Sequence, residues 1–408
     1  MQFKQSQLDN GLAVVAEVNP AAASMAAGFF VRTGSRDETD PVAGVSHFLE
    51  HMMFKGTDRR TPFDINREFD ELGAIYNAFT SEENTVYYAA VLPEFQTAAL
   101  DLLADMLRPA LRDDDFDSEK KVILEEIALY QDRPHFRLYE KLMAQHYSGH
   151  PLGNSILGTN ESIQALTRQA MAEYFGRRYS PANVTLVGVG NLDWDTFTAK
   201  AEQMCSKWLA APADRDTAEA SPAFSQALIT DAKLLRQHVG LVSPAPSAQD
   251  EERYAAHLAA AILGDDTGSR LFYALIEPAI AEDASCSYRP FDAAGAFYTF
   301  LAADPGRAAE ALKIARAEYA RFQADGPTAA ELQAAKNKTA AGATLEGELP
   351  MGRLTAVGSD WVYRKDYRPL AEHIERILAV PADAVTDLVR KYDITATTTL
   401  ALGPNESL

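Results

Sequence analysis

Residues 47–51 of the chain form the pentapeptide His-Phe-Leu-Glu-His. On a helix, residues four positions apart lie about one turn apart on the same face. His47 and His51 can therefore reach one metal ion. Glu50 lies on the same side, close enough to touch a water held by that metal. A pentapeptide also arises by chance on surface helices, so the surrounding sequence has to be weighed.

Zinc is the metal that fits this set of side chains. A catalytic zinc site uses three protein ligands and leaves a fourth position open for water. Zinc lowers the pKa of that water, and a carboxylate such as Glu50 completes its deprotonation. The residue order is that of the inverted H-x-x-E-H motif of zinc proteases. The motif predicts one zinc ion per chain, with a third ligand elsewhere in the sequence.

The sequence on either side of the motif alternates between strand and helix patterns. The turn residues Asp9-Asn10-Gly11 predict a β-hairpin, and residues 25–31 form a second strand pattern. Strands are also predicted over residues 75–92, and helices over residues 42–54, 61–72, 94–107 and 117–131. Because these elements do not follow a strict βαβ rhythm, the predicted fold class is α+β.

The chain contains an internal repeat. Residues 161–191 and 375–405 both begin with Glu-x-Ile-x-Ala, then carry two basic residues before a tyrosine, and end in a β-rich segment. The repeat predicts two homologous sheet-plus-helices domains. We place a zinc-binding catalytic domain at residues 1–209 and a domain without a metal site at 226–408. The segment 210–225, rich in Ala, Pro, Asp and Ser at its start, is the predicted linker.

Composition and charge exclude several classes of protein. Hydrophobic residues make up 47% and charged residues 24% of the chain, as in ordinary globular proteins. The formal net charge of −20 argues against nucleic acid or an anionic membrane as a partner. No signal peptide and no membrane-spanning stretch is visible, so we expect a cytoplasmic protein. The two cysteines, Cys205 and Cys286, cannot form a disulfide framework.

Beyond the pentapeptide, the chain resembles the M16 metallopeptidases, a family that includes pitrilysin, the mitochondrial processing peptidase and small bacterial M16B proteases. The resemblance rests on several strings, at residues 34–38, 44–57, 77–81, 85–88, 119–126 and 150–153, on Gly158, and more weakly on 269–272. It implies a LuxS/metallohydrolase-like half-clamshell of two domains, each a sheet with helices on one side. It also implies a homodimer, or a heterodimer with a homologous M16 subunit, that encloses a chamber.

The resemblance also implies the remaining site residues on the acidic helix. In the family, two glutamates seven residues apart lie on this helix and the second binds zinc. Glu119 and Glu126 have that spacing here. Glu126 is thus the implied third ligand, and Glu119 the residue that supports catalysis by hydrogen bonding within the site. Glu125 is the rival ligand, rotated by ~100° around the helix.

The string Asn77-Ala78-Phe79 resembles the family's active-site edge strand. An exposed strand edge can bind an extended peptide through main-chain hydrogen bonds, and would present the scissile bond to the zinc. We therefore predict that Asn77, Ala78 and Phe79 bind substrate. The alternative is an ordinary strand that happens to carry an asparagine.

The second half departs from the family pattern. Active relatives usually place an Arg and a Tyr, seven residues apart, where they hold the substrate carbonyl. The corresponding positions here are Ile276 and Asp283, which cannot do that work. Tyr288 and Arg289 lie nearby, in a different order and spacing.

The sequence thus predicts a zinc-dependent endopeptidase that hydrolyses unfolded peptides or small proteins. In this mechanism Glu50 takes a proton from water and later delivers it to the leaving amine. Two alternatives stay open. One is a noncatalytic or assembly subunit of an M16-type complex, and the other is a protease dedicated to one peptide precursor.

Overall fold

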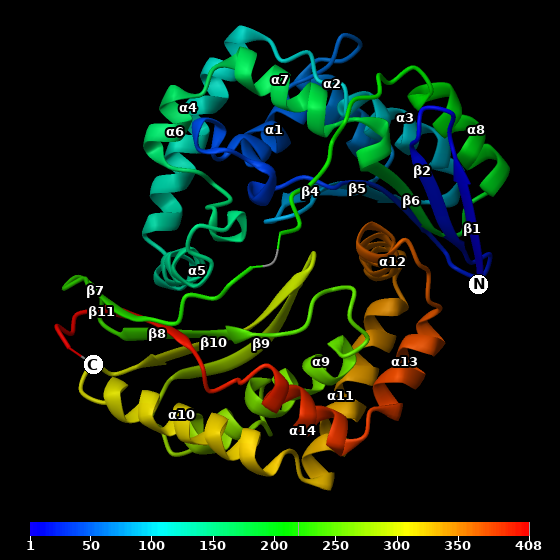
Figure 1. The fold of residues 1–408 in the computed structure, drawn as a ribbon. Helices are drawn as coiled ribbons and strands as arrows, with labels where there is room; N and C mark the ends of the chain where they lie inside the picture. The colour runs from blue at the N-terminus through cyan, green and yellow to red at the C-terminus, as the bar shows by residue number, and fades with distance from the viewer. Residues whose placement is uncertain (219, 408) are drawn as a thin grey trace. The chain divides into compact units, whose positions relative to one another are not determined.

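The computed structural model describes residues 1–218 and 220–407, which form two compact units. Unit 1 comprises residues 1–128, 154–216 and 346–368. Unit 2 comprises residues 129–153, 217–345 and the chain from 369 onward. Each unit is built around one β-sheet with helices packed against it (Figure 1). This is the two-domain α+β fold that the sequence predicts.

The sheet of unit 1 has six strands in the order β1-β2-β6-β3-β5-β4, so β4 lies at one edge. The strands are β1 (Gln2–Gln7), β2 (Ala13–Val18), β3 (Met25–Val31), β4 (Ile75–Thr80), β5 (Thr85–Val91) and β6 (Val184–Gly190). The predicted hairpin at Asp9-Asn10-Gly11 is confirmed, because β1 and β2 pair antiparallel on either side of it. Gly11 has a φ of +94°, a conformation that favours glycine.

The helices predicted in the first half are present with small changes at their ends. They are α1 (Val45–Met53), α2 (Pro62–Glu71), α3 (Gln96–Met106) and α4 (Asp113–Gln131). The structure adds three helices that were not predicted, α6 (Asn160–Ala165), α7 (Arg168–Arg178) and α8 (Trp194–Cys205). Helix α2 shows why such predictions succeed. Thr61 caps it by accepting a hydrogen bond from the Asp64 backbone, and Pro62 occupies its first turn.

The sheet of unit 2 has five strands in the order β7-β11-β8-β10-β9. The strands are β7 (Gln226–Thr230), β8 (Gln237–Pro244), β9 (Asp283–Phe291), β10 (Ala294–Ala303) and β11 (Thr398–Gly403). Its helices are α5 (Pro134–His146), α9 (Arg253–Gly264), α10 (Ala308–Asp325), α11 (Ala329–Gly347), α13 (Leu370–Ala379) and α14 (Ala382–Lys391), with a π-helical turn over Phe272–Ile276. Taken in chain order, β7 to β11 repeat the neighbours and directions of β2 to β6.

One helix in each unit comes from the other half of the sequence. Helix α12 (Pro350–Arg364) packs on β3 and β6 of unit 1, where Leu354 and Val357 join its core. Helix α5 packs on β8 and β11 of unit 2 through Leu138 and Leu142. Each sheet is therefore covered on both faces, whereas the family resemblance implies helices on one side. An apolar sheet face needs a cover, and these two helices supply it. The domain boundaries at residues 209 and 226 were placed from the internal sequence repeat, and they stay a prediction.

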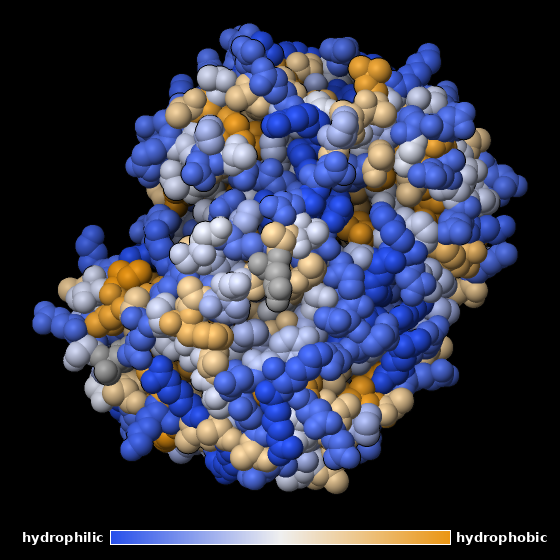
Figure 2. All heavy atoms as spheres, viewed as in Figure 1, coloured by the Kyte–Doolittle hydropathy of each residue, from blue (hydrophilic) through white to orange (hydrophobic). Residues whose placement is uncertain are grey.

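The visible surface is mostly hydrophilic. Figure 2 shows hydrophilic residues over most of the visible face, with apolar residues in separate groups. Across the described parts of the chain, no helix combines the length and the apolar character needed to cross a membrane.

Helix α12 is fixed to the unit 1 sheet by a buried ion pair. Arg353 donates two hydrogen bonds to the Glu17 carboxylate, of 3.0 and 2.5 Å, and the Tyr367 hydroxyl adds a third at 2.8 Å. Glu17 and Arg353 are 1% and 4% exposed. Removing one partner of such a pair leaves the other charge buried and uncompensated.

We therefore expect Arg353→Met to lower the free energy of unfolding by about 3–5 kcal/mol, and the double variant Glu17→Leu/Arg353→Met to recover most of that loss. Urea denaturation followed by tryptophan fluorescence measures both. Arg67→Ala, which removes exposed ion pairs and an exposed contact with the Phe63 ring, is the control and should stay within about 0.5–1 kcal/mol of the wild type. Equal losses in the single and double variants would contradict the assignment.

Candidate metal centre

Helix α1 carries His47, Glu50 and His51 and is anchored by its opposite side. Its apolar residues, Val45, Phe48, Leu49, Met52 and Met53, are buried in unit 1. The N-cap residue is Gly44, which has no side chain to cap the helix. Instead the Glu38 carboxylate accepts hydrogen bonds from the backbone N–H groups of Gly44 and Ser46, at 2.6 and 2.7 Å. The buried apolar residues and the bonds to Glu38 hold the helix in place, and His47, Glu50 and His51 lie together on its polar side.

Helix α4 brings a carboxylate to the two imidazoles. Oε2 of Glu126 lies 3.4 Å from Nε2 of His51 and 3.7 Å from Nε2 of His47. One ligand atom from each residue lies within 4.8 Å of the others. Glu125, the rival ligand, is exposed and outside this group. Of all the residues described, these three form the one cluster with the spacing of a metal site.

The donor set suits zinc. Two imidazole nitrogens and one carboxylate oxygen are the ligand types of catalytic zinc sites. Oε1 of Glu119 lies 2.8 Å from Nδ1 of His51. This hydrogen bond occupies Nδ1 and leaves Nε2 of His51 to bind a metal. Lys55 Nζ lies 2.5 Å from the other oxygen of Glu119. The residues present therefore fit a zinc ion.

The electrostatics of the two histidines differ. Burial, aided by the neighbouring His51, lowers the pKa of His47 to about 3, which favours the neutral imidazole that a metal needs. Burial alone would lower the pKa of His51, but the hydrogen bond to Glu119 and the charge of Glu126 outweigh it and raise the pKa. The raised pKa favours the proton on His51, and a metal at this site competes with that proton.

Glu50 is held beside the cluster by one hydrogen bond. The Thr80 hydroxyl, at the end of β4, donates to Oε2 of Glu50 over 2.5 Å. Burial raises the pKa of the Glu50 carboxyl, although the bond from Thr80 opposes the shift. A carboxylate with a raised pKa is better matched to proton transfer near neutral pH than an exposed one.

The predicted substrate-binding residues lie on the edge strand β4. Asn77 and Phe79 are both exposed, Phe79 to 40%. Ala78 is 9% exposed, and its backbone N–H donates to Oδ1 of Asn77 over 2.9 Å, a contact that a peptide binding at this N–H would replace. The strand end also supplies Thr80, which the sequence analysis did not assign although it belongs to the same string. Lys55 and Glu38 were missed in the same way, each lying within a quoted motif.

The second unit holds no comparable cluster among the residues described. Ile276 packs against the unit 2 core, and Asp283 begins β9 on the surface. The Tyr288 hydroxyl is buried and donates to the carbonyl of Pro246 over 2.8 Å. The exposed Arg289 guanidinium lies 5.3 Å from the centre of the Tyr139 ring.

Comparison with known proteins shows the family to which the chain belongs. A family model for Insulinase (Peptidase family M16) matches residues 13–160, and a model for the Peptidase M16 inactive domain matches residues 165–339. An uncharacterized zinc protease of Mycobacterium leprae is 33% identical, covering 95% of this chain and 88% of the relative. The uncharacterized zinc protease YmxG of Bacillus subtilis is 30% identical, covering 95% of each chain. The chain belongs to the M16 peptidase family.

Solved structures show the same fold. A protease from Helicobacter pylori superposes with a TM-score of 0.91 at 21% identity, covering 99% of both chains. A chain of complex III from Candida albicans superposes with a TM-score of 0.86 at 19% identity, covering 99% of this chain and 96% of that one. At such identities the likeness extends to the fold, and the fold alone does not determine the activity.

The helix register at α4 can be tested by metal content. We expect Glu126→Gln to lose most of its zinc after dialysis, because a neutral amide is a poor substitute for an anionic ligand. Glu119→Gln should weaken zinc binding less, by about 10–100-fold, as is usual for a residue that orients a ligand. Elemental analysis after identical dialysis measures all variants. Glu125→Gln is the matched control, and loss of zinc from that variant instead would show that the register is wrong.

Proposed function

We propose that this chain is a zinc-dependent endopeptidase with one zinc ion per chain. The observation that carries the proposal is the convergence of His47, His51 and Glu126, with the Glu50 carboxylate held at the same side of α1. These groups suit metal-dependent hydrolysis of a peptide bond, with a metal site, a base beside it and an exposed strand edge for the peptide. The curated relatives named zinc proteases support the same class.

The residues of the chain divide the chemistry between them. Zinc, when held by His47, His51 and Glu126, supplies polarisation of the scissile carbonyl and activation of water. Glu50 takes a proton and later gives it to the leaving amine. Glu119 keeps His51 in one orientation through the bond to Nδ1.

The edge strand β4 determines how a peptide would lie. Its outer backbone groups are free of a neighbouring strand in the described sheet, so an extended segment can add to it by main-chain hydrogen bonds. Such binding depends little on side chains, which favours unfolded peptides or small proteins as substrates. Exposed Phe79 and Ile75, 40% and 73% exposed, flank Asn77 along this edge.

One observation favours the alternative of a noncatalytic or assembly subunit. Unit 2 has Ile276 and Asp283 where active relatives carry an Arg and a Tyr, and an aspartate would repel a developing oxyanion. The complete metal-binding set in unit 1 argues against that alternative. Both observations are reconciled if a homologous partner chain supplies the missing pair within a dimeric chamber.

The role of Glu50 gives a direct test. We expect Glu50→Gln to keep its zinc and to lose peptide hydrolysis by about 10²–10⁴-fold, because the change removes the base and preserves both imidazoles. Turnover of a fluorogenic peptide library and zinc content are measured on the same preparation. Glu125→Gln, an exposed neighbour on α4, should cleave at the wild-type rate. Near-normal turnover by Glu50→Gln would refute the mechanism.

The missing Arg/Tyr pair gives a second test. We expect the zinc-loaded chain alone to cleave peptides about 10²–10³-fold more slowly than it does with a homologous subunit that carries the pair, since one lost oxyanion donor has that effect. Cleavage of a mixed unfolded-peptide library is measured with and without the partner. Robust turnover by the chain alone would reject the partner requirement. Loss of that turnover in Arg289→Ala or Tyr288→Phe would then identify the substitute.

A further inference from the structure

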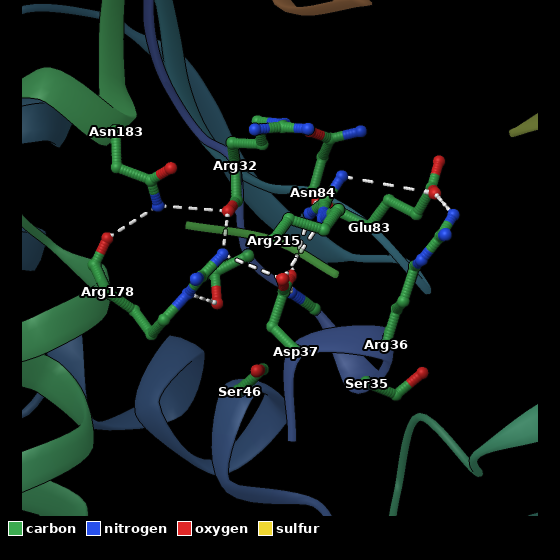
Figure 3. A network of polar contacts seen from close by, with 12 residues as sticks. Arg32, Ser35, Arg36, Asp37, Ser46, Glu83, Asn84, Arg178, Asn183 and Arg215 are labelled. Carbon is green, nitrogen blue, oxygen red and sulfur yellow. Dashed lines mark hydrogen bonds and ion pairs between the residues drawn. The ribbon is translucent and has the colours of Figure 1, made fainter. Parts of the chain in front are cut away.

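Five charged side chains form a buried network in unit 1 (Figure 3). Arg36 donates to the Glu83 carboxylate over 2.6 Å. Arg215 holds both oxygens of Asp37, at 3.0 and 2.7 Å, and Arg178 bonds the same carboxylate over 2.8 Å. The side chains of Arg36, Asp37, Glu83 and Arg215 are at most 2% exposed. Charges are rarely buried so fully unless each is paired, so the network is a specific construction.

The network is built on the segment 34–38, Gly-Ser-Arg-Asp-Glu, a string that the proposed chemistry does not use. At one end Glu38 bonds the backbone of the first turn of α1. At the other end Gly34 lies against the β4–β5 turn, residues 81–84, so closely that a Cβ would lie 2.2 Å from a carbonyl oxygen of that turn. The segment therefore joins the helix that carries the site to the turn that follows β4.

The turn is held by backbone and side-chain contacts. The backbone N–H of Arg36 donates to the carbonyl of Glu82 over 2.8 Å. The Arg215 guanidinium donates to the carbonyl of Glu83, and the Tyr363 hydroxyl from α12 donates to the Glu83 carboxylate over 2.8 Å. Two buried cations and a phenol thus fix Glu83.

This turn determines where Thr80 stands. Thr80 is the last residue of β4 and immediately precedes the turn, and its register partner is Thr85 at the start of β5. The Thr80 hydroxyl makes the 2.5 Å hydrogen bond to Glu50. A shift of the turn would therefore move the one hydroxyl that orients the base.

Arg215 comes from a segment, residues 211–216, that the sequence places in a linker. The backbone N–H of Ala211 donates to Ser180 over 2.9 Å. Arg178 donates to the carbonyls of Ala213 and Asp214, each at 3.0 Å. The segment is thus bound to unit 1 along its length and is not a free tether.

We propose that the segment 211–216 is part of the catalytic scaffold, and that Arg215 is a positioning residue that orients Glu50 through Glu83, the turn 81–84 and Thr80. The inference rests on the proposed function, because orienting Glu50 matters only if Glu50 acts as the base. Arginine suits this role because its planar fork reaches the Asp37 carboxylate and the Glu83 carbonyl together. Lysine, a single point charge, cannot make the same set of bonds.

The first arm of the test measures steady-state peptide hydrolysis. We expect Arg215→Met to lower kcat by about 10–100-fold while KM changes much less, since small misplacements of a reacting group cost that much. Arg253→Met is the matched control. Arg253 is 6% exposed and donates to the Glu251 carboxylate over 3.2 Å, and both residues belong to unit 2, outside the network. Its kcat, corrected for the folded fraction, should equal that of the wild type.

The second arm asks whether Arg215 acts through Thr80. Thr80→Val removes the hydroxyl with little change in shape and should lower kcat, whereas Thr80→Ser should restore it to within a few-fold. In the Thr80→Val background, Arg215→Met should have little further effect on kcat, because the link to Glu50 is already cut. Additive losses, or a wild-type kcat in Arg215→Met, would overturn the proposal.

The third arm does not depend on peptidase activity. Hydrogen exchange measured by mass spectrometry should show faster exchange over residues 80–85 in Arg215→Met and an unchanged rate over β1 and β2. Unchanged exchange over residues 80–85 overturns the proposal even if the wild-type chain proves to have no peptidase activity. If Arg215→Met fails to fold, Tyr363→Phe removes one bond to Glu83 and takes its place in all three arms, with a smaller expected loss of kcat.

Discussion

The whole site depends on helix α1 keeping one orientation, because the side chains that act together are spaced along a single turn of it. Helix geometry places His47, Glu50 and His51 on one side, and burial of the apolar residues of the helix in unit 1 fixes the direction of that side. The first turn has no cap of its own and relies on the Glu38 carboxylate, which accepts two short hydrogen bonds from its backbone. Burial raises the pKa of the Glu38 carboxyl to about 8, and the same low-dielectric surroundings strengthen the two hydrogen bonds that it accepts. A residue outside the helix therefore holds the helix end that the metal ligands need.

The sequence predicts those parts of the molecule that local rules govern. The spacing of His47 and His51 follows from helix geometry, and α1 is present where the motif requires it. The same holds for the hairpin at Gly11, for α2 with its Thr61 cap, and for the seven-residue spacing that places Glu119 and Glu126 on one side of α4. In each case a few neighbouring residues contain all the information, since the pattern and the element have the same period.

Contacts between residues far apart in the sequence could not be predicted in this way. The bond from Thr80 to Glu50 joins residues separated by 30 positions, and the pair Arg353–Glu17 joins residues separated by 336. The segment 211–216 has the composition of a linker, and only its partners show that Arg215 is buried. A pattern of local hydrophobicity also cannot show that a helix from the other half of the chain covers each sheet. Helices α12 and α5 would have the same amphipathic pattern whichever sheet they covered.

The two units show how one topology can hold a site in one copy and none in the other. Helix α9 follows β8 as α1 follows β3, yet α9 is buried on almost every side and is rich in alanine. Its His257 is exposed and has no histidine four residues away on either side with which it could share a metal. The alanines of α9 let this helix lie close to β9 and α14. A metal-binding helix must keep one side polar, and it then needs supports such as Glu38 and the buried ion network to hold that side in place. The copy without a metal is free to replace those supports by apolar packing, and so the difference between the units lies in side chains and not in the fold.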